Sequence, residues 1–400
     1  MPEPDARELK EAACAAVDAL RSELVLISRE IHAHPELAFQ ERRAAALLAD
    51  RLERAGLAVE RGAFGLETAF AAELGPKGAP HVALLAEYDA LPGMGHACGH
   101  NLIATSALGA GLALASLGPR LPGRVRVLGT PAEEQGCGKE LMARRGAFEG
   151  VAAALMIHPA GLNLASMPCI AMAELEVEYR GRAAHAAAMP ERGINALDGL
   201  VLGYQALAAL RQHIGRQERV HGIITDGGQA PNVVPERAAG FFYVRAASFE
   251  ELEPLKRRVE SCFRAGAEAS GAELRLRWGA ADYRDIRFNA PLAAAFQANA
   301  EALGREFLPW DALPEGLQGS TDLGNVSYRV PAIHPMLAAA PLHCTIHNPE
   351  FAKWAGSELG ESAALDGAKA LAMTAIDFFC DADLRRRTRD WFEQAPAPGR

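Results

Sequence analysis

The 400-residue sequence predicts an α/β protein in which a smaller α+β domain is inserted into a larger one. Three observations lead to this prediction. A chain of this length exceeds what a single hydrophobic core usually covers. Short apolar runs that are typical of buried strands recur, and each is followed by polar side chains able to bind metal. The middle of the chain instead contains alternating strands, and the earlier pattern returns after about residue 285.

The composition excludes several classes of protein. The net charge of −9 comes from scattered charges, whereas a nucleic-acid-binding protein would need a basic face. The first residues are acidic and lack the apolar segment of a signal peptide. The longest uncharged stretch, between Leu102 and Arg120, contains several glycines and predicts a buried helix rather than a membrane span. Seven cysteines without regular spacing make no disulfide framework, so we expect a reducing cytoplasm.

The chain begins with two helices joined by a loop that contains histidines. Apolar residues recur at helical spacing over residues 6–31, and a second helix is predicted for residues 41–56. His32 and His34 lie between the helices. They could be metal ligands, but we favour the interpretation that they hydrogen-bond to the backbone of the loop.

The most informative stretch covers residues 84–101. It starts in a short apolar run, which predicts a buried strand, and continues through Glu87 and Asp89 into a Pro-Gly loop. Cys98 and His100 follow, and a tight turn at Gly99 would let both face one ion. A single Cys-x-His is weak evidence for a metal site. Charged groups at the end of a buried strand are costly unless they are paired. Whether this stretch binds metal is therefore decided by possible partner residues further along the chain.

The same pattern occurs at two further predicted strands. Residues 125–129 are apolar and precede Glu133 and Glu134, and residues 153–157 are apolar and precede His158. Two adjacent carboxylates repel each other unless a cation lies between them or one keeps its proton; the alternative is a solvated turn. Open α/β sheets place their active sites at the carboxyl ends of the strands, so these residues mark the expected site.

A change of pattern near Ala173 marks the start of the inserted domain. Residues 174–180 alternate between apolar and acidic side chains, which predicts a strand with one solvated face. A helix at 196–214, two strands, a helix at 250–267 and a strand at 273–278 complete a βαββαβ arrangement. The predicted domains are a larger one, residues 1–173 and 285–400, and an inserted one, residues 174–284.

Together these motifs resemble the co-catalytic metallopeptidases and amidohydrolases of peptidase family M20. The resemblance covers nearly the whole chain and rests on HACGH, the Glu133-Glu134 pair, His158, GRAAHAAAMPE, APNVVPE and HNPEF. It is strongest to the cysteine-bearing subfamily D, especially its aminobenzoyl-glutamate hydrolases and β-alanyl-lysine dipeptidases, and it extends to hippurate and auxin-conjugate hydrolases. Many of these members have Asp in place of Asn101. The resemblance implies a zinc-exopeptidase-like αβα sandwich with an inserted ferredoxin-like domain for dimerisation and as a lid.

The resemblance also implies a centre of two divalent transition-metal ions. The implied ligands are Cys98, His100, Glu134, His158 and His347. A thiolate with imidazoles suits Zn, Mn, Ni or Co, and the sequence does not choose among the four. Relatives outside the subfamily have a metal-binding His at the position of Glu87, which puts that ligand in doubt here. Asp89 is implied to orient a ligand imidazole, and His96 and His343 are expected to give supporting hydrogen bonds.

Four further residues receive roles from the resemblance. Glu133 resembles the general base of the family. His185 matches a histidine that in relatives reaches the partner subunit's active site and stabilises the oxyanion; the alternative is a plain loop histidine. Asn232 and Arg245 match residues that bind the carboxylate of the substrate, although a structural salt bridge would also explain Arg245.

These assignments predict a metal-dependent amidohydrolase or dipeptidase that cleaves the amide bond of an N-acyl or aminoacyl amino acid with a free carboxylate. A hydrolase that uses Cys98 as nucleophile would leave the polar residues at the other strand ends unexplained, and an inactive partner subunit would not need all the ligands. We expect no nucleic-acid or membrane partner. We expect a homodimer, because one predicted helix has an apolar stripe suited to a twofold interface. The stripe consists of Leu197, Leu200, Val201, Tyr204, Leu207 and Leu210.

Overall fold

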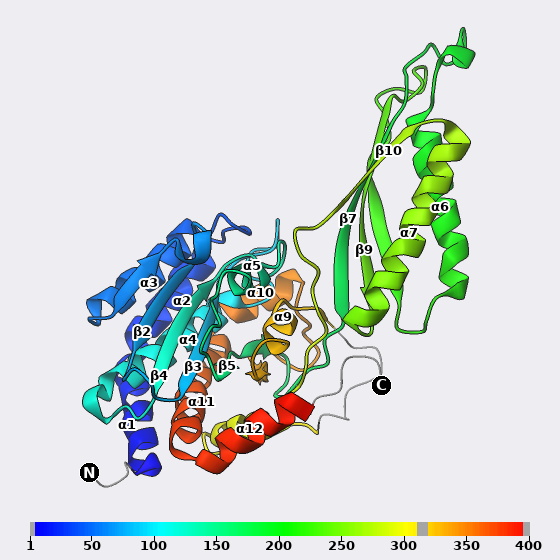
Figure 1. Ribbon diagram of the computed structural model, residues 1–400. Coiled ribbons are helices and arrows are strands. Elements are labelled where there is room, and N and C mark those ends of the chain that lie inside the picture. Colours follow the sequence, from blue (N-terminus) through cyan, green and yellow to red (C-terminus); the bar gives the residue numbers. More distant parts are fainter. Residues whose placement is uncertain (1–4, 310–318, 395–400) are drawn as a thin grey trace. The chain divides into compact units, whose positions relative to one another are not determined.

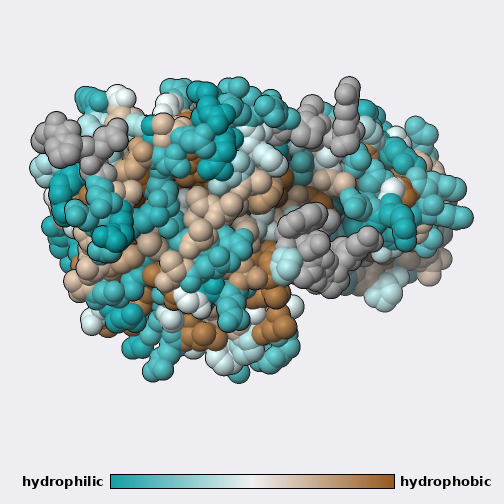
Figure 2. Space-filling model, turned by 90° about the horizontal axis from the view of Figure 1, so that it is seen from below, coloured by the Kyte–Doolittle hydropathy of each residue, from teal (hydrophilic) through white to brown (hydrophobic). Residues whose placement is uncertain are grey.

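The computed structural model describes residues 5–309 and 319–394, which form two compact units (Figure 1). The first unit runs up to Pro168 and resumes at Ile286, and the second runs from Cys169 to Asp285 and includes Ser320. The second unit is therefore inserted into the first, and the predicted fold class is confirmed. On the face shown in Figure 2, hydrophilic residues are interspersed with small hydrophobic patches, which agrees with the scattered charges of the sequence.

The first unit is built on a mixed sheet of six strands in the order β1-β2-β4-β3-β5-β11. The strands are β1 (Ala58–Arg61), β2 (Phe70–Leu74), β3 (His81–Glu87), β4 (Arg124–Thr130), β5 (Ala153–Leu155) and β11 (Ala332–Ile333). β4, β3, β5 and β11 are parallel, whereas β1 and β2 pair antiparallel. A separate parallel pair is formed by β6 (His158–Ala160) and β12 (Met336–Ala338). The central strand β3 is buried along its whole length, as its unbroken apolar run predicts.

The helix α4 (His100–Ser116) connects β3 to β4 and is buried along nearly its whole length. It contacts α1 (Ala6–Ala19), α2 (Arg21–Ala33) and the long helix α11 (Glu358–Cys380). Gly109 permits this close packing, because a Cβ at this position would lie 2.9 Å from the Cβ of Ala368. The predicted buried helix is confirmed, and none of the described helices is long and apolar enough to cross a membrane. The single helix predicted for residues 6–31 is instead divided at Leu20 into α1 and α2.

Further α-helices complete the described part of the first unit. They are α3 (Arg42–Arg54), α5 (Gly138–Ala143), α8 (Ala290–Glu301), α9 (Leu323–Ser327), α10 (Pro349–Ala355) and α12 (Ala382–Gln394). The predicted strand near 332–336 is wrong in one respect: the chain is interrupted after Ile333, and β11 and β12 belong to different sheets. This interruption carries the buried His334 away from the main sheet.

The second unit is a four-stranded antiparallel sheet in the order β10-β7-β9-β8, with the βαββαβ arrangement that the sequence predicts. Its elements are β7 (Ala171–Arg180), α6 (Ala196–Leu210), β8 (Arg219–Asp226), β9 (Arg237–Ala246), α7 (Phe249–Ser270) and β10 (Glu273–Trp278). Leu175, Val177 and Tyr179 on β7 are buried, as the alternating pattern predicts. Figure 1 shows α6 and α7 side by side on one face of this sheet.

The apolar stripe of α6 mostly faces the core of its own unit, which corrects the sequence interpretation. Leu200 and Leu207 are fully buried. The residues of the stripe that are partly buried against the same core are Leu197, Tyr204 and Leu210. The reason is that α6 lies against α7 and the sheet and needs this face for packing. The exposed large apolar side chains of α6 and of the edge strand β8 are instead Val201, Leu202, Ile223 and Ile224.

Candidate metal centre and active site

Five side chains predicted to bind metal come together in the first unit. Cys98 and His100 follow β3, Glu134 follows β4, and His158 follows β5. His347 comes from the loop before α10. The potential ligand atoms form two groups, in each of which they lie within 4.8 Å of one another: Cys98 with His100 and His158, and Cys98 with Glu134 and His347. Because β3, β4 and β5 are parallel, their carboxyl ends meet at one edge of the sheet, and Cys98 belongs to both groups.

The turn that precedes α4 requires glycine. Gly99 has a φ of +77°, and a Cβ at this position would lie 2.5 Å from Cγ of Pro159. This turn connects Cys98 to His100, the first residue of α4. On the opposite side, the backbone N–H of His347 donates to the carbonyl of Ala97 at 2.8 Å, which fixes the second loop beside the first.

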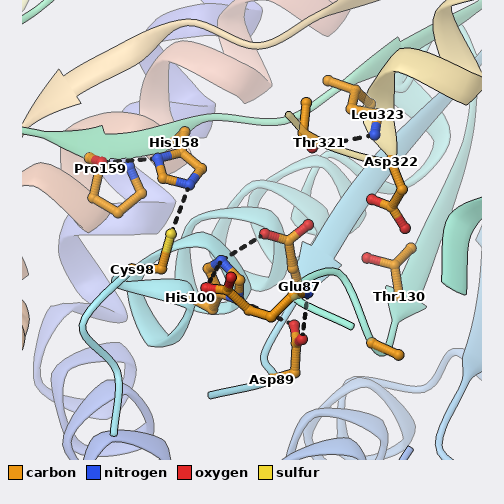
Figure 3. Close-up of polar contacts among 12 residues, drawn as sticks. Glu87, Asp89, Cys98, His100, Thr130, His158, Pro159, Thr321, Asp322 and Leu323 are labelled. Atoms are coloured by element: carbon orange, nitrogen blue, oxygen red, sulfur yellow. Dashed lines mark hydrogen bonds and ion pairs between the residues drawn. The ribbon is translucent and has the colours of Figure 1, made fainter. Parts of the chain in front are cut away.

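The imidazole of His100 is held in one orientation by Asp89 (Figure 3). Its Nδ1 lies 3.0 Å from Oδ1 of Asp89, and Oδ2 of Asp89 accepts the N–H of Glu134 at 2.9 Å. Nε2 of His100 then lies 3.1 Å from Oε1 of Glu87 and 3.7 Å from Oε1 of Glu134. Nε2 of His100 and the two Oε1 atoms of Glu87 and Glu134 have no hydrogen-bond partner within the described residues. Burial alone would lower the pKa of His100, but Glu87, Cys98 and Asp89 raise it well above its usual value.

The donor set fits a divalent transition metal. Oε1 of Glu87, Nε2 of His100 and Oε1 of Glu134 are buried and have no hydrogen bond in the described part of the chain, and bound cations would satisfy them. Sγ of Cys98 lies 3.4 Å from Nε2 of His158, whose Nδ1 lies 2.8 Å from the carbonyl of Pro159. The carbonyl can only accept, so Nδ1 carries a proton and Nε2 is available as a ligand. Thiolate and imidazole are ligands that Zn, Co, Ni and Mn accept in differing degree.

The neighbouring carboxylates Glu133 and Glu134 belong to different groups of side chains. Glu134 lies with Cys98 and His347, whereas the carboxylate of Glu133 lies with Glu87 and His100. Glu133 is buried, and burial raises its pKa well above the usual value, with Glu87 and Glu134 acting in the same direction. The preceding residue, Ala132, has a φ of +60°, a conformation that costs a residue with a side chain about 1–3 kcal/mol. The surrounding structure must therefore hold this turn.

Sequence analysis missed a buried ionic network that supports Glu87. Nζ of Lys139 contacts Oε2 of Glu87 and lies 2.6 Å from Oδ1 of Asp322, and the backbone N–H of Lys139 donates to Oδ2 of Asp322 at 2.8 Å. All three side chains are essentially inaccessible to solvent. Burial alone would lower the pKa of Lys139, but Asp322 and Glu87 raise it. The lysine thus holds one oxygen of Glu87 and leaves the other directed at His100.

His334 is a second residue that sequence analysis missed. Its ring centroid lies 5.1 Å from that of His158, and neither of its nitrogens has a hydrogen-bond partner within the described part of the chain. Burial lowers its pKa to about 3, so the ring is neutral. The apolar run before it and the Pro after it are typical of an ordinary strand end, so the sequence contains no signal that separates His334 from a structural histidine.

Three further histidines of this unit contact backbone carbonyls, as predicted for them. Nε2 of His32 lies 2.7 Å from the carbonyl of Ala352, and Nδ1 of His34 lies 3.0 Å from the carbonyl of Glu30. Nε2 of His96 lies 3.1 Å from the carbonyl of Ile31, which ties the metal-binding loop to α2. His343 differs from the prediction: it is exposed, its Nε2 lies 3.8 Å from Oε1 of Glu350, and no supporting hydrogen bond of its side chain is found within the described residues.

The remaining predicted site residues lie in the second unit. His185 and Asn232 are exposed in adjacent loops, where the N–H of Ala186 donates to the carbonyl of Asn232 at 3.0 Å. These loops adjoin the end of the sheet where Arg180 pairs with Arg237, the first residue of β9. Arg245 lies near the other end of β9, which at a rise of about 3.3 Å per residue corresponds to roughly 26 Å. One chain therefore does not bring Asn232 and Arg245 together, and their joint binding of a carboxylate stays a prediction.

Arg245 is half-buried and is not engaged by a carboxylate of the described residues. Its Nη1 donates to Oγ of Ser320 at 3.0 Å, and its guanidinium lies 5.8 Å from the centroid of the Tyr243 ring. It forms no salt bridge with any residue that the structure describes. The structural salt bridge considered as an alternative for Arg245 is therefore not found within residues 5–309 and 319–394.

Comparisons with known proteins agree with this geometry. Residues 83–375 match the model of Peptidase family M20/M25/M40. Xaa-Arg dipeptidase of Mus musculus is 43% identical, over 96% of this chain and 92% of that protein. One of the subunits of p-aminobenzoyl-glutamate hydrolase from Escherichia coli (strain K12) is 28% identical, over 95% of this chain and 94% of that protein. The crystal structure of a dinuclear metal-binding peptidase from Bacillus subtilis has the same fold, with a TM-score of 0.66 at 21% identity over 90% of this chain and 99% of that chain.

The buried network gives a prediction about stability. Replacing Lys139 with Met should lower the free energy of unfolding by about 3–5 kcal/mol, because Glu87 and Asp322 would be left as buried carboxylates without their cation. Denaturant titration of the first unit's unfolding measures this loss. The control is Lys77→Met, which removes an exposed lysine and should change the stability by less than about 0.5 kcal/mol. Equal stability of the two variants would contradict the assigned role of the network.

Proposed function

The chain belongs to peptidase family M20 and is a metal-dependent hydrolase of amide bonds in acyl or aminoacyl amino acids, and we propose that its substrates are dipeptides with a basic leaving residue. The observation that carries the catalytic assignment is the convergence of metal-ligand side chains on the sheet edge, where buried atoms of Glu87, His100 and Glu134 have no hydrogen-bond partner among the described residues. The substrate class is supported by the similarity to a protein named Xaa-Arg dipeptidase.

The residues that would hold the ions are Cys98, His100, Glu134, His158 and His347, and Cys98 belongs to both of the groups that they form. Glu87 lies close enough to His100 to add an oxygen ligand. When bound, the two ions supply Lewis acidity, which makes a water molecule acidic and polarises the amide carbonyl. Their identity among Zn, Mn, Ni and Co stays open, since all four accept this donor set in some degree.

Glu133 is proposed as the general base. Its carboxylate lies within 4.8 Å of the ligand atoms of Glu87 and His100 without belonging to the two groups that contain Cys98. It would take a proton from the attacking water and deliver it to the leaving nitrogen. Asp89 would keep His100 oriented through Nδ1, so that Nε2 is available as a ligand.

His185 is proposed as the donor that stabilises the oxyanion. Its Nδ1 accepts backbone N–H groups from Ala188 at 3.1 Å and from Ala187 at 3.3 Å. Because Nδ1 is used as an acceptor, the proton of the neutral ring is on Nε2. An exposed imidazole with a fixed Nε2–H can donate to the negative oxygen that develops in the transition state.

We infer that Arg245 and the His185–Asn232 pair act on one substrate only when they come from different chains. A dipeptide is about three residues' rise or less in length, far shorter than the roughly 26 Å of strand between these residues in one chain. A homodimer would supply Arg245 from one subunit and the other two from its partner. The exposed apolar side chains on α6 and the edge strand β8, including Ile223 at 64% exposure, support this unit as the dimer interface.

We also propose a cytoplasmic location. None of the seven cysteines, all of which lie within residues 5–309 and 319–394, forms a disulfide, which is the state expected in a reducing compartment. Cys98 in particular must remain a thiol or thiolate to act as a shared ligand.

The metal and base assignments are tested by a pair of adjacent variants. Glu133→Gln should retain both ions and lose about 10²–10⁴-fold in kcat, because it removes proton transfer and leaves the ligands in place. Glu134→Gln should lose metal as well as activity. Mass spectrometry of bound metal together with kcat measures both effects, with the exposed Glu60→Gln as a control. Normal turnover by Glu133→Gln with both ions bound would refute its role as base.

The substrate assignment is tested at the carboxylate. Ala-Arg and Ala-Lys should be cleaved faster than p-aminobenzoyl-glutamate, and the amides of these dipeptides should be poor substrates. Arg245→Ala should lower kcat/KM on the acids by about thirty- to a thousandfold, or about 2–4 kcal/mol, with little effect on the amides. Arg219→Ala is the matched control, because Arg219 pairs opposite Arg245 on β8 and is exposed. Equal losses on acids and amides would mean that Arg245 supports the fold instead.

The dimer is tested by complementation. Mixed and reassociated His185→Ala and Glu133→Gln subunits should recover up to about a quarter of the wild-type activity, because half of the random dimers are mixed and each has one intact site. Each variant alone should remain nearly inactive, and sedimentation should report a dimer at the assay concentration. A fully active monomer, or a mixture no more active than its parts, would exclude sharing of the site.

A further inference from the structure

Glu41 is a buried carboxylate that none of the preceding assignments uses. It lies directly before α3 and has no exposed surface. A residue at this position commonly caps its own helix through its side chain, but Glu41 makes no such hydrogen bond. Its side chain must therefore find its partners elsewhere, because a buried carboxylate without hydrogen bonds is costly.

Those partners lie in two other segments of the first unit. Oε1 of Glu41 accepts the backbone N–H of Ala132 at 2.8 Å, and Oε2 accepts the hydroxyl of Thr68 at 2.8 Å. Burial and the charge of Asp89 raise the pKa of Glu41 to about 7. Both the neutral and the ionised carboxyl can accept from Ala132, so this contact does not depend on the state of the group.

The contact with Ala132 falls on the strained turn that carries Glu133. Ala132 has a φ of +60°, and it precedes Glu133 directly. On the other side of Glu133, the N–H of Glu134 donates to Asp89 at 2.9 Å. The turn is thus held by one buried carboxylate on each side of the residue proposed as the base.

The carbonyl side of the turn is held separately from the N–H of Ala132. The N–H of Gly138 donates to the carbonyl of Ala132 at 3.2 Å, and a Cβ on Gly138 would lie only 1.8 Å from the carbonyl oxygen of Pro131. Loss of the Glu41 contact would leave the N–H of Ala132 buried without its acceptor. Rotation of the Pro131–Ala132 peptide toward another acceptor would relieve that cost, and it would change the direction of the next side chain, Glu133.

We propose that Glu41 is a positioning residue: by accepting the N–H of Ala132, it fixes the strained peptide that aims Glu133 at the site. This inference rests on the proposed role of Glu133 as general base. Asp89 performs the corresponding task for Glu134 while it also holds His100. Neither oxygen of Glu41 belongs to a group of potential metal ligands within the described residues, so its effect should fall on the base and not on metal binding.

Three variants test the proposal. Glu41→Gln keeps an acceptor for Ala132 and an amide for Thr68, and it should retain kcat within about threefold. Glu41→Met has similar length but no acceptor, and it should lower kcat by about ten- to a hundredfold, the loss expected when a catalytic group is misplaced by about 1 Å. Thr68→Val removes the other hydrogen bond of Glu41 and leaves Ala132 held, so kcat should stay near wild type.

The readouts separate positioning from a structural role. Bound metal should remain at two ions in all three variants, KM should change little, and the loss in Glu41→Met should be in kcat at a temperature where thermal melting shows the variant folded. Wild-type kcat in folded Glu41→Met, loss of metal from that variant, or an equal loss of kcat in Glu41→Gln would overturn the proposal.

The same experiment includes Glu133→Gln, so that failure of the base assignment is recognised separately. If Glu133→Gln turns over normally, the proposed function of Glu133 fails and Glu41 has no base to position. If Glu133→Gln is inactive with both ions bound and Glu41→Met is fully active, only the inference about Glu41 fails.

Discussion

The burial of charge at the carboxyl edge of the first unit's sheet is the constraint on which the rest of this structure depends. Glu87, Asp89, His100 and Lys139 are all essentially inaccessible to solvent. An isolated charge in such a place would cost several kcal/mol, so each must be paired or bound to a cation. Asp89 is paired with His100, and Lys139 is paired with Glu87 and Asp322. After this pairing, buried atoms of Glu87, His100 and Glu134 still have no hydrogen-bond partner among the described residues. Divalent cations would neutralise the negative charge that remains there.

This constraint explains how much of the site the sequence could reveal. Charged residues after apolar strands are visible as a pattern, so Cys98, Glu134 and His158 could be placed at one sheet edge from the sequence alone. Lys139 follows a Gly-Cys-Gly turn and Asp322 lies in a distant loop, and nothing local distinguishes them from solvated residues. Their pairing depends on α5 meeting the loop before α9, a tertiary contact that periodicity does not contain.

In the second unit, too, local sequence patterns predict the elements but not how the elements place the site residues. The sequence predicted its strands and helices because alternation and helical spacing are local. Asn232 and Arg245 are separated by the length of β9, which places Arg245 at the other end of the sheet although only a short loop and one strand lie between them. The apolar stripe of α6 was misassigned for a related reason: a stripe shows that a face is buried, but whether its own sheet or a second chain covers it depends on packing.

Backbone strain gathers at the site, and this too escapes sequence analysis. Five described residues other than glycine adopt positive φ, and three of them, Ala132, Cys137 and His347, lie at or beside the site. The first two flank the Glu133–Glu134 pair, and the third is itself a proposed ligand. A turn signal in sequence is mainly a glycine or asparagine, and none is present at these three positions. The strain persists because Glu41, Asp89 and the carbonyl of Ala97 accept hydrogen bonds from the surrounding backbone and hold it. The strained backbone lowers the stability of the fold, but it lets two adjacent carboxylates take different roles: Glu134 as a proposed metal ligand and Glu133 as the proposed base.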